Sequence, residues 1–76
     1  MTEKEFINKM ESMGHIVKAN MSMLSVYKDS SYANMNSSMG WVYQTCPNVM
    51  RTFISATPKV VRMMAELAAT DPKNRI

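Results

Sequence analysis

The sequence predicts an α+β fold in which helices cover one face of a small antiparallel sheet. Three observations support this prediction. Apolar side chains recur at helical spacing in residues 1–14, strand-forming and turn-forming residues fill 15–36, and helical spacing returns after residue 47. Strands followed by helices are typical of α+β domains. We therefore expect an N-terminal helix, a three-stranded antiparallel β-meander and two C-terminal helices packed on one sheet face.

The N-terminal helix is expected over residues 3–13. Thr2 and Glu5 have the spacing of a capping box, in which each side chain accepts a hydrogen bond from the backbone amide of the other residue. The apolar positions that follow at helical spacing are Phe6, Ile7, Met10 and Met13. Gly14 then stands where a helix often ends in a left-handed residue.

The meander is expected over residues 15–36. The stretch HIVKAN is rich in β-branched residues, and MLSVY alternates Leu24 and Val26 with the other face of a strand. KDSS has the composition of a turn, and YANMN, residues 32–36, is expected to return as the third strand. The expected inner face consists of Val17, Ala19, Leu24, Val26, Ala33 and Met35. The segment WVYQ after Gly40 either extends the sheet or begins a connection.

Two helices are expected after the sheet. Thr45 and Pro47 fit a helix start, and a short helix over residues 47–55 is predicted from the stripe of Val49, Met50, Phe53 and Ile54. Thr57 and Pro58 fit a second start. The second helix has its own apolar stripe, which consists of Val60, Val61, Met64, Leu67 and Ala68. Pro72 ends this helix, and residues 70–76 are expected to form a frayed tail.

The composition indicates one small domain over residues 1–76. A core of this size supplies only about 3–5 kcal/mol of stability, and the single cysteine, Cys46, excludes an internal disulfide. A homodimer is therefore expected as a source of further stability. The N-terminal segment lacks the apolar region of a signal peptide, and no apolar run reaches the roughly 18 residues of a membrane span. A cytoplasmic location is expected.

Neither catalysis nor a metal site is expected. Cys46 and His15 have no third group to orient them, and the two glycines form no phosphate-binding loop. The Met21 and Met23 thioethers have the spacing of a Cu(I) site on a strand, but methionine is more often a filler of irregular cores. We expect no cofactor. Met35 is expected in the core, whereas Met21, Met23 and Met39 are left between the outer face and a dimer seam.

Two binding surfaces compete as candidates. Aromatic and methionine residues are enriched in protein interfaces, so a protein-binding surface is predicted to consist of Tyr27, Tyr32, Trp41 and Tyr43 with Lys18 and Lys28 at its rim. Aromatic rings with interleaved cations also stack on single-stranded nucleic acids. The residues expected in a nucleic-acid surface are Lys59, Arg62, Lys73 and Arg75. The competing structural interpretation is that Trp41 and at least one tyrosine lie in the core or in a dimer interface.

Three stretches of the chain resemble small, uncharacterised proteins encoded by phages and prophages of Gram-positive bacteria. They are KEFINKMESMGHIVK, LSVYKDSSYANMN and FISATPKVVRMMAELAATDPKNR. The resemblance implies a phage accessory protein that binds and inhibits a host protein, such as a defence nuclease, in the infected cell. Anti-CRISPR proteins are one such class. Many of them are acidic mimics of nucleic acid, whereas this chain has a net charge of +3. An inhibitor of this composition is therefore expected either to block an acidic protein surface or to drive its target into a complex. The alternative is a basic nucleic-acid-binding accessory factor.

Overall fold

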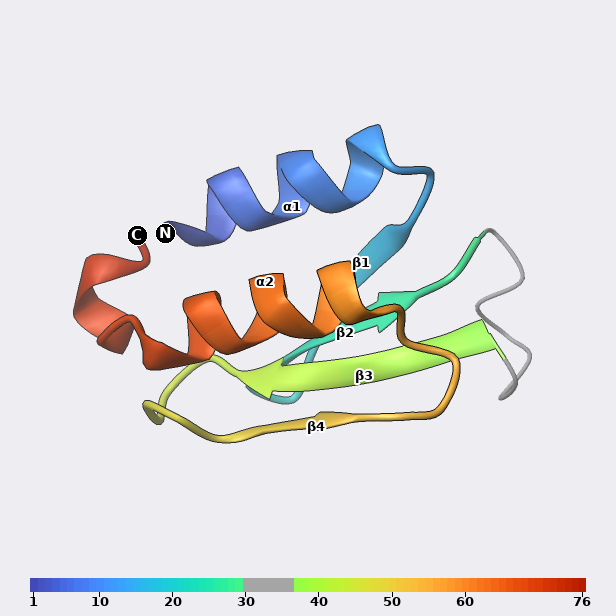
Figure 1. The fold of residues 1–76 in the computed structure, drawn as a ribbon. Coiled ribbons are helices and arrows are strands. Elements are labelled where there is room, and N and C mark those ends of the chain that lie inside the picture. Colours follow the sequence, from blue (N-terminus) through green and yellow to red (C-terminus); the bar gives the residue numbers. More distant parts are fainter. Residues whose placement is uncertain (30–36) are drawn as a thin grey trace.

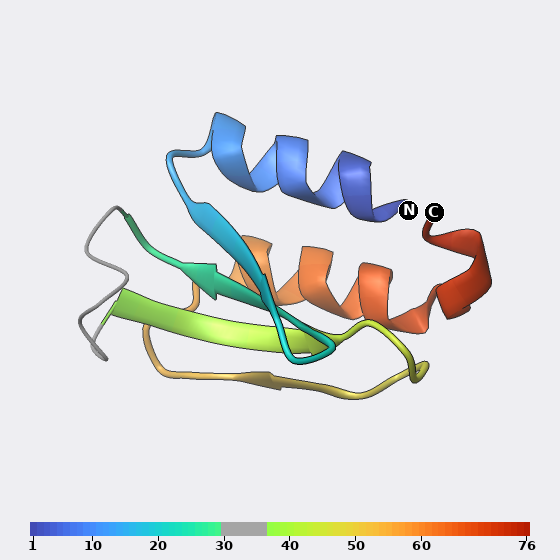
Figure 2. The ribbon, with the colours of Figure 1, turned by 180° about the vertical axis from the view of Figure 1, so that it is seen from behind.

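The computed structural model describes residues 1–29 and 37–76, which form a four-stranded antiparallel sheet with both α-helices on the same face (Figures 1 and 2). The elements are α1 (Glu3–Ser12), β1 (Ile16–Asn20), β2 (Met23–Tyr27), β3 (Ser38–Tyr43), β4 (Met50–Thr52), α2 (Pro58–Ala69) and the 3-10 helix η2 (Pro72–Asn74). The strands lie in the order β1-β2-β3-β4. The α+β class is confirmed, but the sheet has a fourth strand and a single α-helix follows it.

The capping box of α1 forms as predicted. The Glu5 amide donates to Thr2 Oγ1 over 3.1 Å, and the Thr2 amide donates to Glu5 Oε1 over 3.0 Å. The bond from the Thr2 amide, together with the nearby Thr2 hydroxyl, stabilises the charged carboxylate, so the pKa of Glu5 lies below its ordinary value. The helix ends one residue earlier than expected, at Ser12, and Gly14 follows with φ +84°.

A two-residue turn joins β1 to β2. Asn20 pairs with Met23 across the hairpin, so Met21 and Ser22 alone form the loop. Both have positive φ, 50° and 68°, which is the backbone of a type I′ turn. This turn normally carries Asn-Gly, because positive φ strains residues with a bulky side chain. Met21 is 84 % exposed at the tip of this hairpin.

The third described strand is β3, which pairs with β2. The third strand expected at residues 32–36, including Ala33 and Met35, lies outside the described residues. A register shift between Val26 and Tyr27 lets β3 bulge opposite them. Gly40 lies at this point with φ +143°, and a Cβ there would collide with the Arg51 carbonyl of β4. The sheet can close on β4 at this position only because residue 40 has no side chain.

The prediction of a helix over residues 47–55 is wrong. The chain turns back after Asn48, whose φ is +59°, and Met50–Thr52 pairs with β3 as the edge strand β4. The Tyr43 amide donates to the Val49 carbonyl over 3.1 Å, which continues this pairing. Met50 packs against the core, whereas Ile54 is fully exposed. The apolar stripe in the sequence therefore belongs to a strand and a loop, not to one helix face.

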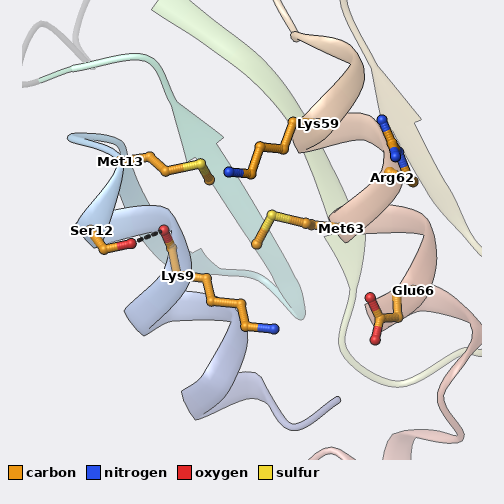
Figure 3. Close-up of a pocket in the computed structure, with 7 residues that line it drawn as sticks. All are labelled: Lys9, Ser12, Met13, Lys59, Arg62, Met63 and Glu66. Atoms are coloured by element: carbon orange, nitrogen blue, oxygen red, sulfur yellow. Dashed lines mark hydrogen bonds between the residues drawn. The ribbon is translucent and has the colours of Figure 1, made fainter.

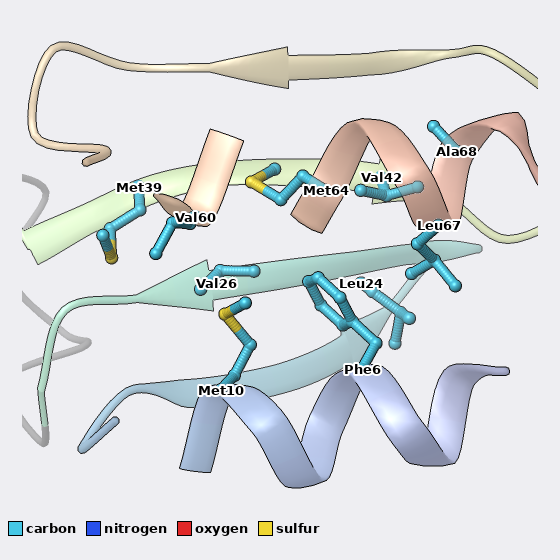
Figure 4. Close-up of a cluster of buried hydrophobic side chains, with 10 residues drawn as sticks. All are labelled: Phe6, Met10, Leu24, Val26, Met39, Val42, Val60, Met64, Leu67 and Ala68. Atoms are coloured by element: carbon cyan, nitrogen blue, oxygen red, sulfur yellow. The ribbon is translucent and has the colours of Figure 1, made fainter. Parts of the chain in front are cut away.

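The core lies between the sheet and the two helices (Figure 4). It consists of Phe6, Met10, Leu24, Val26, Met39, Val42, Val60, Met64, Leu67 and Ala68. The α2 helix was predicted correctly, with Thr57 Oγ1 accepting a hydrogen bond from the Val60 amide over 3.3 Å. Met39, whose surface the sequence left open, is buried. Of the expected inner-face residues in β1, Val17 is partly buried against the core. Ala19 pairs with Leu24 and so lies on the expected side of the sheet, but its side chain is exposed.

The segment after α2 is ordered around Arg75, where a frayed tail was expected. Arg75 is 1 % exposed. Its Nε donates to the Thr70 carbonyl over 2.8 Å, its Nη1 donates to Tyr43, and its Nη2 donates to Cys46 and Ala68 over 3.2 and 3.1 Å. The guanidinium thus joins the end of α2 to the connection between β3 and β4.

The two ends of the chain lie side by side (Figure 1). The Glu3 amide donates to the Arg75 carbonyl over 2.6 Å. The Met1 ammonium donates to Thr70 Oγ1 over 3.3 Å. These bonds attach the start of α1 to the segment that follows α2. Among the described residues, no helix has the length and apolar character needed to cross a membrane.

Candidate functional site

The sheet face opposite the helices is the candidate binding surface. Figure 2 shows the strands from this side, with α2 behind them. Strand alternation directs Leu24, Val26 and Val42 into the core, so the residues between them point outward. We call this surface the aromatic face. It is formed by Tyr27, Trp41, Tyr43 and Phe53 with Lys18 and Arg51.

One cross-strand row runs through the middle of the aromatic face. Lys18 pairs with Ser25, Ser25 pairs with Trp41, and Trp41 pairs with Arg51. Neighbouring strands lie about 4.8 Å apart, so the Cα atoms of Lys18 and Arg51, on the two edge strands, lie roughly 14 Å apart. Trp41 lies between them, next to Arg51 on β4. This row places an aromatic ring between two positively charged residues.

The aromatic rings of this face also contact other side chains of the same face. The centroids of Trp41 and Tyr43 lie 5.0 Å apart with an interplanar angle of 60°. The Arg51 guanidinium carbon lies 5.7 Å from the centroid of the Phe53 ring, a cation–π arrangement. These contacts limit the motion of three aromatic side chains and one cation, so less conformational entropy is lost when a partner binds.

The charged side chains that the strands contribute to the aromatic face are all positive. Lys18 and Arg51 are the charged residues of the four described strands. Most of the acids lie elsewhere: three are on α1, Glu66 is on α2, and Asp71 precedes η2. Asp29 follows β2 in the chain. A partner that covers the centre of the aromatic face therefore meets cations and rings.

The structure brings together four of the six residues predicted for the protein-binding surface. Tyr27, Trp41, Tyr43 and Lys18 lie on the aromatic face, and the three rings are half-buried. Lys28 follows β2 and is exposed, but strand alternation does not place it among the outward residues. Tyr32 lies outside the described residues.

Sequence reasoning missed Arg51 and Phe53. Both lie in the segment that was read as a helix. The alternation in residues 50–53 could have identified them, because Met50 and Thr52 share one side of the strand while Arg51 and Phe53 share the other. Three residues of strand are too short for that alternation to outweigh the helical stripe.

The residues predicted for a nucleic-acid surface do not form one surface. Lys59 and Arg62 line a groove beside α1. Lys73 lies on η2, beyond the other end of α2, a 12-residue helix about 18 Å long. Arg75 was assigned wrongly, because its guanidinium is buried and donates to four backbone carbonyls. A continuous stripe of cations along α2 and η2 is therefore absent from the described residues.

The nucleophile and base considered from the sequence are far apart. His15 lies at the corner between α1 and β1, where its Nδ1 donates to the Lys28 carbonyl over 2.9 Å. Cys46 lies in the connection between β3 and β4, at the opposite end of the sheet (Figure 1). Within residues 1–29 and 37–76, no three His, Cys, Asp or Glu side chains are grouped as metal ligands would be.

Comparison with known proteins gives no family to which these features can be assigned. Neither the family models, nor the curated proteins, nor the solved structures that were searched contain a match to this chain.

Proposed function

We propose that this protein is a non-enzymatic accessory protein that binds a partner protein through the aromatic face. The observation that carries this proposal is the row across all four strands, in which Trp41 stands between Lys18 and Arg51 on a face that neither helix covers. Tryptophan, tyrosine and arginine are the residues that most often dominate binding energy at protein interfaces. The aromatic face supplies all three types.

The proposed partner presents an acidic surface. Lys18 and Arg51 at the two edges of the row attract carboxylates, and complementary charge both steers encounter and disfavours basic partners. The resemblance to phage proteins supports a host protein as the target, such as a defence nuclease in the cytoplasm of the infected bacterium. Binding would then inhibit the target by covering its surface, without chemistry performed by this chain.

A single-stranded nucleic acid is the alternative partner of the aromatic face, because Trp41 and Arg51 are also the residue types that stack on bases. One observation weighs against it. Trp41 and Tyr43 contact each other at 5.0 Å, so a base cannot enter between these two rings. An interface with a second copy of the chain is a further use of the same face.

The test is capture of partners from a lysate of a Gram-positive host, followed by reconstitution with the purified partner. We expect Trp41→Ala and Arg51→Glu to weaken the reconstituted complex by about 30-fold or more, because central interface residues contribute about 2 kcal/mol or more. Lys4→Glu changes a cation on α1, away from the aromatic face, and should leave affinity unchanged. Arg51 is exposed, so its variant remains informative if the Trp41 variant folds poorly.

Three outcomes would contradict the proposal. One is a captured partner whose affinity is insensitive to both substitutions. A second is a homodimer, measured by light scattering, that Arg51→Glu dissociates while no other partner binds. A third is binding of a 12-residue oligothymidylate with a steep dependence on salt and quenching of Trp41, which would assign the face to nucleic acid.

A further inference from the structure

A groove on the helix side of the molecule is the candidate for a second binding surface. A groove of about 580 Å³ runs between α1 and α2, and it is lined by Lys9, Ser12, Met13, Lys59, Arg62, Met63 and Glu66 (Figure 3). It lies on the side of the sheet opposite to the aromatic face. The two surfaces share no residue, so what binds here is independent of the proposed function.

The groove combines cations with thioethers. In Figure 3 the Lys59 side chain extends from α2 toward Met13, and Met63 points from α2 toward α1. Lys9 approaches the same gap from α1. The lysines are exposed, whereas Met13 and Met63 are half-buried and pack against the core. The floor is therefore apolar and adaptable, and ammonium groups stand on both sides of it.

The charge of the groove favours an anionic occupant. Three cations line it, and Glu66 is the one acid among the described lining residues. Ser12 adds little recognition of its own, because its hydroxyl already donates to the Lys9 carbonyl over 2.7 Å. An occupant that supplies carboxylates to Lys9, Lys59 and Arg62 would satisfy charges that otherwise repel one another across the gap.

The apolar floor distinguishes between two classes of anion. A nucleic-acid backbone needs a run of cations to follow its phosphates, but α2 carries Glu66 two turns after Lys59. The lining residues that the structure describes also include no ring on which a base could stack. A peptide with acidic and apolar residues on one face fits both features. Its apolar side chains would cover Met13 and Met63, as in other complexes where a helix enters a methionine-lined groove.

We propose that the groove between α1 and α2 binds an acidic amphipathic segment of a partner protein. The distance along α2 from Lys59 to Glu66 is about 11 Å at 1.5 Å per residue, which is the length of two helical turns of the bound segment. Acidic residues of the segment lie over Lys9 and Lys59. Its apolar residues lie on the two methionines, and its less acidic end lies beside Glu66.

The experiment selects ligands for the full chain from a displayed library of random 12-residue peptides, with a 12-residue oligothymidylate as a separate probe. The selected peptides should carry Asp or Glu together with apolar residues at helical spacing. Their affinity, measured by fluorescence anisotropy, should fall about tenfold or more with Lys9→Glu or Lys59→Glu. It should rise with Glu66→Lys. Lys73→Glu, on η2 outside the groove, and Trp41→Ala, on the aromatic face, are the controls and should leave it within about twofold.

The proposal is overturned if no peptide is enriched above the empty support, or if the enriched peptides are basic. It is also overturned if Lys73→Glu weakens binding as much as Lys59→Glu, because general charge rather than the groove would then explain the affinity. Loss of binding with Trp41→Ala, in a variant whose circular dichroism is unchanged, would place the peptides on the aromatic face instead. Tighter binding of the oligothymidylate that depends on Lys9 and Lys59 would assign the groove to nucleic acid.

Discussion

Replacing Arg75 with alanine should remove a large part of the free energy of unfolding. The guanidinium donates four hydrogen bonds to backbone carbonyls in a site that is 1 % exposed. Hydrogen bonds to charged groups contribute about 1.5–3 kcal/mol each, although the freed carbonyls regain part of this from water. We expect a net loss of about 3–5 kcal/mol. Proteins have about 0.05–0.15 kcal/mol of stability per residue, so 76 residues have about 4–11 kcal/mol in total.

Urea unfolding followed by the fluorescence of Trp41, the single tryptophan, measures this loss. Lys73→Ala is the matched control, because Lys73 is exposed in the same segment, and it should change stability by less than about 0.5 kcal/mol. Arg75→Lys keeps the charge, but its ammonium cannot span carbonyls from four residues, so it should also destabilise the fold. The reasoning fails if Arg75→Ala costs less than about 1 kcal/mol, or if Arg75→Lys unfolds at the wild-type midpoint.

Three further predictions concern single positions. Gly40→Ala should lower the free energy of unfolding by more than about 3 kcal/mol, because the added Cβ meets a backbone carbonyl of β4. Gly14→Ala should lower it by only about 1 kcal/mol, because residue 14 has φ +84° but open space around it. Urea unfolding measures both losses. Ser22→Gly should raise stability by about 0.5–1 kcal/mol in the same assay, because it relieves a positive φ. The lowered pKa of Glu5 means that its contribution is present above the unfolded pKa and is lost as pH falls through the folded pKa. Wild type should therefore lose more stability than Glu5→Gln between about pH 6 and about pH 3.

Each of these three predictions has an outcome that would contradict it. Equal costs for the two glycine variants would mean that φ, and not the approach of β4, determines what residue 40 tolerates. A Ser22→Gly protein less stable than wild type would show that turn strain is smaller than the entropy that glycine adds to the unfolded chain. A Glu5→Gln protein with the acid sensitivity of wild type would show that other carboxylates dominate.

The two α-helices and the first hairpin could be predicted from the sequence because their signals are local. Thr2 and Glu5 close a capping box within four residues, and Thr57 accepts from an amide three residues away. In β2, the alternation of apolar and other residues places Leu24 and Val26 on one face of the strand and the residues next to them on the other. Each of these patterns is decided by contacts close in sequence, so one chain is enough to recognise it.

The fourth strand and the buried arginine depend on contacts that are distant in sequence. The Asn48 amide donates to the Ala68 carbonyl over 2.7 Å, twenty residues away, and this bond helps hold the turn before β4. Arg75 donates to Tyr43, 32 residues away. Its partners are backbone carbonyls, which every residue possesses, so no side-chain pattern marks them. For the same reason the candidate site was only partly predicted, because Arg51 and Phe53 join it through β4.

The contact between the two ends of the chain makes the fold suitable for circular permutation. Because the Glu3 amide bonds to the Arg75 carbonyl, a short linker could join residue 76 to residue 1 without disturbing either helix. New ends could then be opened between Met21 and Ser22, where both φ angles are already strained. Such a circular permutant should keep the sheet order and both proposed binding surfaces. It would also move any attached label from the helix layer to the tip of the first hairpin.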